Sequence, residues 1–188
     1  MSLPHALLTS LLERPSSGLD LARRFDSSIA YFWHASHQQI YRELGRMEAS
    51  GWVTADETGE RGGRKVHRVL PAGRAELERW TAEPAPRPDT RDALAVRLRA
   101  DAVLGGGTTA ATMRAHFTDR IATHEATLAG YRAIEERDFA SVAAEDRAGR
   151  LRHAILLGGI AQEESSIRWC RSVLDLLEDL VELEESPG

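Results

Sequence analysis

Side chains of the types that contact nucleic acids are concentrated between positions 36 and 46. Gln38 and Arg42 can form paired hydrogen bonds with an adenine or guanine edge, and Tyr41 can reach a phosphate. Gly45 would let a helix approach a groove closely. An ordinary solvated helix face is the alternative interpretation. The candidate contact residues in this stretch are Ser36, His37, Gln38, Tyr41, Arg42 and Arg46.

A basic stretch follows between positions 61 and 74. Lysine and arginine neutralise phosphates, and arginine is suited to the minor groove. A solvated charged turn is the alternative interpretation. The stretch has no acidic residue, and its five cations are Arg61, Arg64, Lys65, Arg68 and Arg74. We take as candidate contact residues Arg61, Arg64, Lys65 and His67.

The distribution of charge permits contact with phosphates, although the formal net charge of the chain is -5. Residues 1–83 carry 11 Lys and Arg against 11 Asp and Glu, so the excess of acid lies in residues 84–188. Salt confines the field of a surface patch to roughly 10 Å. A local basic patch can therefore contact phosphates even on an acidic protein.

Apolar residues at helical spacing predict three helices before position 51. The first helix ends before Pro15, and residues 16–18 then predict a turn. Ser36 can cap the third helix, which Gly51 ends. The apolar sets of the three helices are Leu3, Leu7, Leu8, Leu11 and Leu12, then Leu19, Leu21, Ala22 and Phe25, then Ile40, Leu44 and Met47.

From Trp52 onward the periodicity changes to that of β-strands. Residues 52–55 and 66–70 predict two short strands around a Gly-rich turn at 58–63. Pro71 then suits the start of a fourth helix. Three helices, a hairpin and a returning helix are the order of elements in a winged helix-turn-helix. We therefore expect a small α+β DNA-binding domain over residues 1–82.

The second half of the chain predicts long helices. Residues 83–91 contain three prolines and predict a short, stiff linker. Helices are then expected near residues 90–104, 109–138 and 144–184, with a glycine-rich break at 105–107. The fold class is thus mainly α, with an α+β winged helix-turn-helix domain followed by a helical dimerisation and effector domain over residues 92–188.

One face of the last predicted helix is apolar. Its members are Leu151, Ile155, Ile160, Ile167, Cys170, Leu174, Leu177 and Val181. Helices of this length cannot bury such stripes within one arm of about a hundred residues. We therefore expect a partner chain, most simply a homodimer with two-fold symmetry through the C-terminal helices.

Several classes of function lack support in the sequence. No HExxH, GxSxG or phosphate-binding lysine motif is present, so we expect no enzyme, no cofactor and no metal site, and we interpret the histidines as solvated or capped. Cys170 is the single cysteine, which excludes an internal disulfide and predicts a packed thiol. The absence of a long apolar run or signal peptide predicts a cytoplasmic protein without membrane contact.

Several segments match the pattern of a known family. They are Ser17-Gly18, Phe32-Trp33, residues 36–44, residues 47–53, Arg64-Lys65-Val66-His67 and residues 72–77. Together these segments resemble the PadR-type transcriptional regulators, specifically the longer variety with a helical C-terminal domain. The resemblance implies a homodimer that binds a palindromic operator in double-stranded DNA, often as a repressor that a small molecule releases.

The chain departs from this family pattern at three places. Gln38 stands where the family usually has glycine at the start of its recognition helix, so the operator preference is less transferable. Leu19 replaces a common tyrosine. Leu70-Pro71 replaces the usual threonine before the fourth helix, which alters capping and not the fold.

The four tryptophans have two interpretations. Core packing beside the hinge between the domains is the favoured one. The alternative rests on the resemblance, because PadR-like dimers can hold planar molecules between aromatic side chains. In that case a hydrophobic effector site would be lined by Trp33, Trp80 or Trp169.

The expected function is a sequence-specific DNA-binding transcriptional regulator. A winged helix used as a protein-interaction adaptor, without DNA affinity, is the first alternative. An enzyme built in the helical half is the second, and it would require a convergent set of acidic and histidine side chains that the sequence does not contain.

Overall fold

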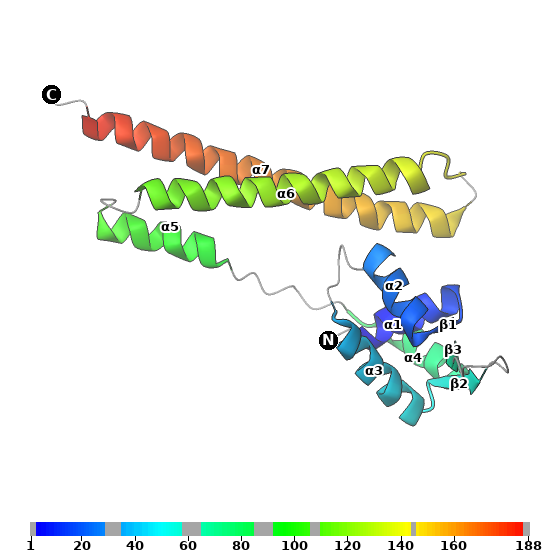
Figure 1. Ribbon diagram of the computed structural model, residues 1–188. Helices are drawn as coiled ribbons and strands as arrows, with labels where there is room; N and C mark the ends of the chain where they lie inside the picture. Colours follow the sequence, from blue (N-terminus) through cyan, green and yellow to red (C-terminus); the bar gives the residue numbers. More distant parts are fainter. Residues whose placement is uncertain are drawn as a thin grey trace. The chain divides into compact units, whose positions relative to one another are not determined.

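The computed structural model describes residues 3–28, 35–57, 65–84, 92–105, 110–143 and 146–185 (Figure 1). The chain divides into two compact units, Met1–Arg87 and Pro88–Gly188. Helices dominate both units, and a small sheet occurs in the first, so the prediction of a mainly α protein is confirmed. Most of the predicted linker, from residue 85 to 91, lies outside the described residues.

The N-terminal unit has the element order predicted for a winged helix, with one additional strand. Its elements are α1 (Leu3–Glu13), β1 (Ser16–Ser17), α2 (Gly18–Ser28), α3 (His37–Ala49), β2 (Val53–Glu57), β3 (Lys65–Val69) and α4 (Pro71–Ala82). Pro71 occupies the first turn of α4, where its fixed φ suits the helix and its missing N–H costs no hydrogen bond.

The additional strand corrects the sequence prediction for residues 16–18. Ser16 and Ser17, predicted to lie in a turn, form the edge strand β1 of an antiparallel sheet with the order β1-β3-β2. Ser16 pairs with His67 and Ser17 with Val66. Two residues show no periodicity of their own, and this strand exists only because β3 supplies its hydrogen-bonding partners.

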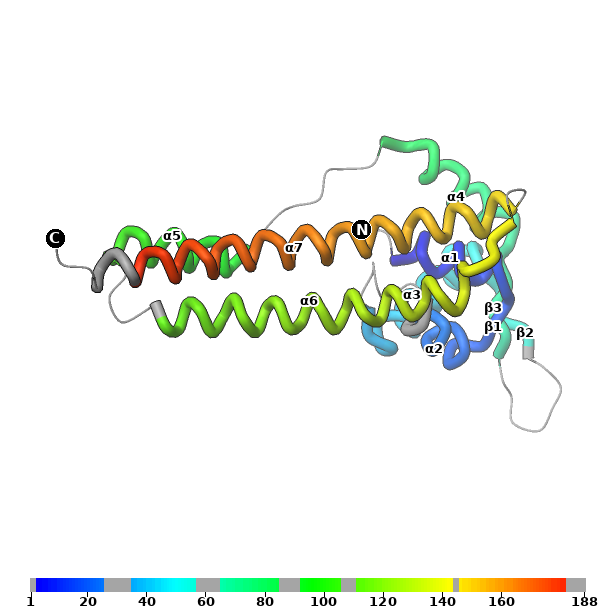
Figure 2. The backbone as a smooth tube through the Cα atoms, turned by 90° about the horizontal axis from the view of Figure 1, so that it is seen from above, coloured from blue at the N-terminus to red at the C-terminus, as the bar shows by residue number. Residues whose placement is uncertain are grey.

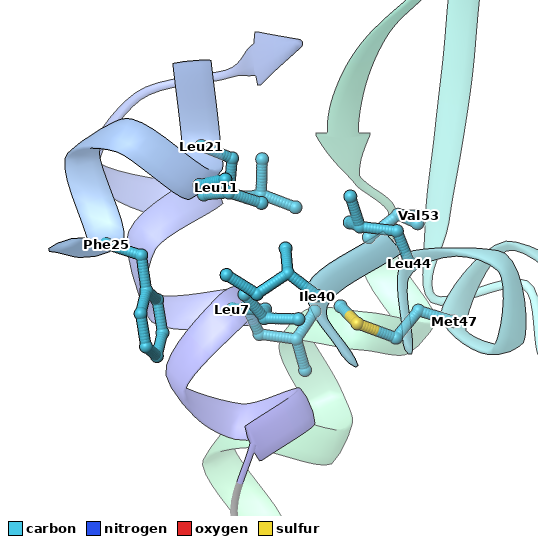
Figure 3. Packing of buried hydrophobic residues seen from close by; sticks show 10 residues of the cluster. Leu7, Leu11, Leu21, Phe25, Ile40, Leu44, Met47 and Val53 are labelled. Carbon is cyan, nitrogen blue, oxygen red and sulfur yellow. The ribbon is translucent and has the colours of Figure 1, made fainter. Parts of the chain in front are cut away.

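The apolar side chains of α1, α2 and α3 point toward one another and form a single core with Val53 of β2 (Figure 3). The inward positions predicted for the third helix are confirmed, since Ile40, Leu44 and Met47 are all buried. Leu19 differs from the prediction, because it is 41% exposed at the start of α2. The buried members of this core are Leu7, Leu8, Leu11, Leu21, Ala22, Phe25, Ile40, Leu44, Met47 and Val53.

The returning helix α4 packs closely against the start of the hairpin. The backbone N–H of Leu70 donates to the carbonyl oxygen of Trp52 at 2.8 Å. Gly73 is buried in the next turn, and a Cβ atom at this position would overlap that carbonyl oxygen and lie 3.1 Å from Cδ2 of Leu8. The absence of a side chain at Gly73 therefore allows direct contact between the two backbone segments.

The second unit consists of α5 (Ala93–Leu104), α6 (Ala110–Asp138) and α7 (Arg147–Glu185). The long helices α6 and α7 run antiparallel and side by side, as Figure 2 shows. Asp92 caps α5, because its carboxylate accepts hydrogen bonds from the backbone N–H groups of Leu94 and Ala95. The core between the helices contains Met113, Phe117, Cys170, Val173 and Leu177.

The apolar stripe predicted for the last helix is only partly buried within one chain. Ile160, Ile167, Cys170 and Leu177 are buried as predicted, and Leu174 packs against their core. Leu151 and Ile155, in contrast, are 51% and 47% exposed. Among the described residues, no helix is long and apolar enough to span a bilayer.

Candidate nucleic-acid interface

A capping box defines the start of α3. The Ser36 hydroxyl oxygen accepts a hydrogen bond from the backbone N–H of Gln39 at 3.2 Å, and the Gln39 side-chain oxygen accepts one from the backbone N–H of Ser36 at 2.8 Å. These two bonds satisfy donors that helix termini otherwise leave unpaired. They hold the first turn, with His37 and Gln38 on it, in a defined position on the surface.

The face of α3 opposite the core is polar and exposed. Gln38, Tyr41, Arg42 and Arg46 all lie on this exposed side of the helix, as predicted. The Arg46 guanidinium is 3.2 Å from the carboxylate of Glu43, one turn back on the same helix. A Cβ atom at Gly45 would have no other atom within 4 Å, so this part of the helix surface is open. Side chains of these types, on a helix with one apolar face, can contact base edges and phosphates.

Only some of the basic residues predicted for the hairpin lie within the described residues. Lys65 is exposed at the start of β3, where it is paired in register with Glu57. Arg68 forms an ion pair of 3.3 Å with Asp56 of β2. The predicted contact residues Arg61 and Arg64, and the turn at 58–63, lie outside the described residues.

The sequence predicts that His67 contacts DNA, which requires an exposed side chain, but the residue is buried. The residue is only 9% exposed and lies on β3, where it pairs with Ser16 of β1 and Ala55 of β2. Its Nδ1 atom is buried without a hydrogen-bond partner. Side chains alternate along a strand, so His67 lies on the same side of β3 as Lys65. His67 is further from the start of β3, however, and it is buried whereas Lys65 is exposed. We therefore correct the prediction and omit His67 from the candidate surface.

A cavity of about 460 Å³ lies beside the exposed face of α3. Ser17 of β1, the first residues of α2 and the start of β3 form its other walls. Its lining is mostly apolar, with Leu19 and Leu44 among the contributing side chains, and it includes the ring of His67. No pattern in the sequence indicates this cavity, because its walls come from four separate elements.

Among the described tryptophans, Trp52 packs against the N-terminal core as predicted, whereas Trp80 and Trp169 are partly exposed. The Trp80 ring stacks on His5 with the ring centroids 4.4 Å apart, yet Trp80 is 38% exposed. The rings of Trp169 and Phe117 are in a T-shaped arrangement with their centroids 5.5 Å apart, and Trp169 is 37% exposed. Both of these rings pack against an aromatic neighbour within their own unit. Trp33 lies outside the described residues, and a role for these rings in effector binding remains a prediction.

Charged groups near these rings have identifiable partners. The Arg79 guanidinium and the His5 ring both hydrogen-bond to Glu76 and hold the pKa of its carboxyl at about 2. In the second unit, the Arg120 guanidinium lies over the Trp169 ring and lowers the pKa of Asp92 through a hydrogen bond of 2.7 Å. Both clusters connect helices within a unit.

Cys170 is fully buried in the second core, and burial raises the pKa of its thiol. A protonated thiol in an apolar setting is a packing group, as predicted. Among the described residues, no group of three or more His, Cys, Asp or Glu side chains could hold a metal ion.

The first unit combines a three-stranded sheet with a capped helix that has one polar face. The second unit is built on two long antiparallel helices. These are the features of a winged-helix regulator. The family model for the transcriptional regulator PadR-like family matches residues 7–79, and the model described as "Virulence activator alpha C-term" matches residues 90–178. The chain is 45% identical to the "Probable transcriptional regulator Rv1176c" of Mycobacterium tuberculosis, over 95% of this chain and 99% of that protein. The chain belongs to the PadR-like family of transcriptional regulators.

Two further relatives are similar in sequence or structure. The Vibrio cholerae virulence activator AphA has 33% identity and a TM-score of 0.79, with 95% of this chain and 99% of that chain covered. The Bacillus subtilis "Negative transcriptional regulator PadR" is 32% identical over 90 residues, which are 47% of this chain and 50% of that protein. Its structure with operator DNA shares the fold at a TM-score of 0.79, with 94% and 99% covered and 23% identity overall, and it has also been solved with p-coumaric acid.

Proposed function

We propose that this DNA-binding regulator acts as a homodimer on a palindromic operator and represses transcription there. The observation that carries the proposal is the polar, exposed face of α3, which lies opposite the buried Ile40, Leu44 and Met47 on a firmly capped helix. Two such helices in a symmetric dimer would enter successive major grooves about 34 Å apart. A dimer bound over a promoter represses by mass-action competition with the transcription machinery.

The proposed contacts divide by chemistry. Gln38 and Arg42 are proposed to read base edges, because their side chains can form paired hydrogen bonds. Tyr41 is proposed to contact a phosphate, with Ser36, His37 and Arg46 at the edges of the same surface. Arg61, Arg64 and Lys65, which we call the wing, are proposed to contact flanking phosphates through their positive charge.

Dimerisation is supported by apolar side chains that one chain leaves exposed. Leu151 and Ile155 are one turn apart on α7, and both are about half exposed although they continue the stripe of the last helix. Further exposed apolar residues of the second unit are Val96, Val103, Leu104, Leu157, Leu176 and Leu180. Exposed apolar patches of this kind mark interaction surfaces, and a second copy of the chain is the partner that we propose.

We also propose that a small hydrophobic effector releases the dimer from DNA. The support is the partial exposure of Trp80, which stacks on His5, and of Trp169, which packs against Phe117 and under the Arg120 guanidinium, together with Trp33 from the sequence. A relative, Bacillus subtilis PadR, has been solved with p-coumaric acid. An effector shifts the population toward a non-binding form by no more than its difference in affinity for the two forms. Tryptophan fluorescence during titration with planar hydrophobic compounds tests this site, and no response across a broad panel would refute it.

Selection of bound fragments from random genomic DNA tests the main proposal. The purified chain should retain fragments that share an inverted repeat with half-sites about one helical turn apart. A reporter gene behind that repeat should be expressed more strongly when the regulator is absent. Failure to enrich any fragment would favour the protein-interaction adaptor, and weaker expression in the absence of the regulator would identify an activator.

The salt dependence of binding tests the wing. Replacement of Arg61, Arg64 and Lys65 with alanine should weaken binding to every DNA sequence to a similar degree. The slope of log K against log salt concentration should decrease by about 0.9 for each phosphate that the wing no longer neutralises. An unchanged slope would exclude the wing as a phosphate-binding element.

A further inference from the structure

Gly18, the first residue of α2, is in contact with Tyr41 of α3. An ideal Cβ atom built on Gly18 would lie 2.5 Å from Cε1, 3.1 Å from Cδ1 and 3.4 Å from Cζ of Tyr41. These three atoms, which are the nearest to the position, all belong to the Tyr41 ring. The first distance is shorter than real Cβ contacts. The ring therefore occupies space that any other residue at position 18 would fill.

The backbone at Gly18 does not itself require glycine. Among the described glycines, positive φ angles occur at Gly51 and Gly105, and Gly18 is not one of them. The start of α2 is supported independently, because the Ser17 hydroxyl oxygen accepts a hydrogen bond from the backbone N–H of Asp20 at 3.2 Å. Alanine has a better helix propensity than glycine. The structure therefore gives one reason for glycine at position 18, which is the contact with the Tyr41 ring.

Tyr41 has room to move if it is displaced from Gly18. The residue is 49% exposed on the polar face of α3. Its ring also borders the cavity of about 460 Å³ whose other walls include Leu19, Leu44 and Gly45. A Cβ atom at Gly18 would therefore push the ring into open space and not into packed atoms, so the core could remain intact while the phenol group moves.

We propose that Gly18 is a positioning residue for DNA binding: its lack of a side chain lets the Tyr41 ring rest on the backbone of α2 and so sets the location of the phenol hydroxyl. This inference rests on the proposed function, in which Tyr41 contacts DNA. The two helices of the helix-turn-helix are thereby coupled at a contact outside the apolar core. The contact determines where one side chain of the DNA-reading face is held.

A double-mutant cycle tests the proposal with the full-length chain and an operator fragment obtained by selection. Gly18→Ala and Tyr41→Ala should each weaken binding about tenfold, which is the effect of losing roughly one hydrogen bond to a charged group. The double variant should bind as weakly as Tyr41→Ala alone, because no ring remains to be displaced. The slope of log Kd against log salt should stay unchanged in Gly18→Ala, since Tyr41 carries no charge.

Controls separate positioning from folding. Thermal unfolding by circular dichroism measures the folded fraction, to which each affinity is referred. Gly130→Ala in α6, where a Cβ atom would have no other atom within 4 Å, should leave the affinity at the wild-type level and the stability unchanged or slightly raised. Wild-type affinity in Gly18→Ala, or losses in the double variant that multiply to about a hundredfold, would overturn the inference. A wild-type chain that binds no specific fragment would overturn the proposed function and, with it, this inference.

Discussion

Gln38 is exposed in the first turn of α3, next to the capping box that Ser36 and Gln39 form. The capped first turn fixes the backbone from which the Gln38 side chain extends. The resemblance to the PadR-type regulators implies that glycine is usual at this position. This chain can therefore make a contact at that place for which a glycine has no atoms.

Replacement of Gln38 with alanine should change the choice of DNA sequence more than overall binding. The variant should lose about 1–3 kcal/mol of discrimination at one base pair of each half-site, because a paired hydrogen bond to that base is removed. The measurement compares affinities for the operator and for operators with single base changes. Equal discrimination by the variant and the wild type would exclude base reading by Gln38, and unchanged thermal unfolding serves as the control.

Glu76 provides a residue-scale prediction about pH. Hydrogen bonds from Arg79 and His5 hold its pKa at about 2 in the folded chain, whereas an unfolded glutamate has a pKa of about 4.3. A depressed pKa stabilises the fold above the unfolded value, and this stabilisation is lost as the pH falls toward 2. Glu76→Gln should reduce the free energy of unfolding at pH 7 by about 1 kcal/mol, a modest figure because solvent screens the pair.

Urea unfolding of Glu76→Gln and the wild type at several pH values checks this prediction. The difference between the two proteins should be constant above about pH 5 and should shrink as the pH is lowered toward 2. A difference of the same size at pH 7 and at pH 2 would show that the substitution acts through packing instead of charge.

At the scale of elements, the packing of α4 against Trp52 depends on Gly73. A methyl group at this position would overlap the Trp52 carbonyl oxygen, which is held by a hydrogen bond from the backbone N–H of Leu70. A backbone atom of this kind cannot move aside as a flexible side chain can. The contact therefore determines how closely the returning helix approaches the hairpin.

Gly73→Ala should accordingly destabilise the N-terminal unit. Overpacking of a tight contact costs about 1–3 kcal/mol, which outweighs the gain in helix propensity of at most about 1 kcal/mol. Chemical unfolding followed by circular dichroism measures the loss. The matched change Gly130→Ala, at an open position in α6, should be neutral or slightly stabilising, and equal stabilities for the two variants would contradict the packing argument.

The elements themselves could largely be predicted from local patterns. The inward face of α3 and the start of α4 at Pro71 follow from spacing and backbone chemistry over a few residues. The strand β1 could not be predicted, because its hydrogen bonds come from β3 about fifty positions later. The burial of His67 has the same origin, since strand alternation gives the side of the sheet but not what covers it.

At the scale of the whole molecule, the exposed apolar residues of the helical unit predict association between copies. Leu151 and Ile155 lie one turn apart on α7 and are half exposed in the single chain. Exposure of such a surface to water is unfavourable, and about 25 cal/mol is gained for each Å² that a partner covers. One side of the helical unit thus packs into its own core, and another side is exposed and can pack against a second copy.

Replacement of both Leu151 and Ile155 with glutamate should shift the protein from dimer to monomer. Paired negative charges within a buried apolar interface cannot be compensated, so dimer dissociation should increase by at least about a hundredfold. Sedimentation velocity measures the association state. Gln162→Glu adds a charge to the same helix without removing an apolar side chain and should leave the association state unchanged. A variant that sediments like the wild type would exclude this face as the dimer interface.

The sequence by itself determined the local features: the mainly α class, the polar and apolar faces of α3, and the basic stretch of residues 61–74. These features depend on neighbours three or four residues apart along the chain. The tertiary structure alone decided that Ser16 and Ser17 form a strand, that His67 is covered, and that Gly18 supports the Tyr41 ring. Each of these depends on a contact between residues more than twenty positions apart, and chain spacing does not specify which distant side chain will occupy a given space.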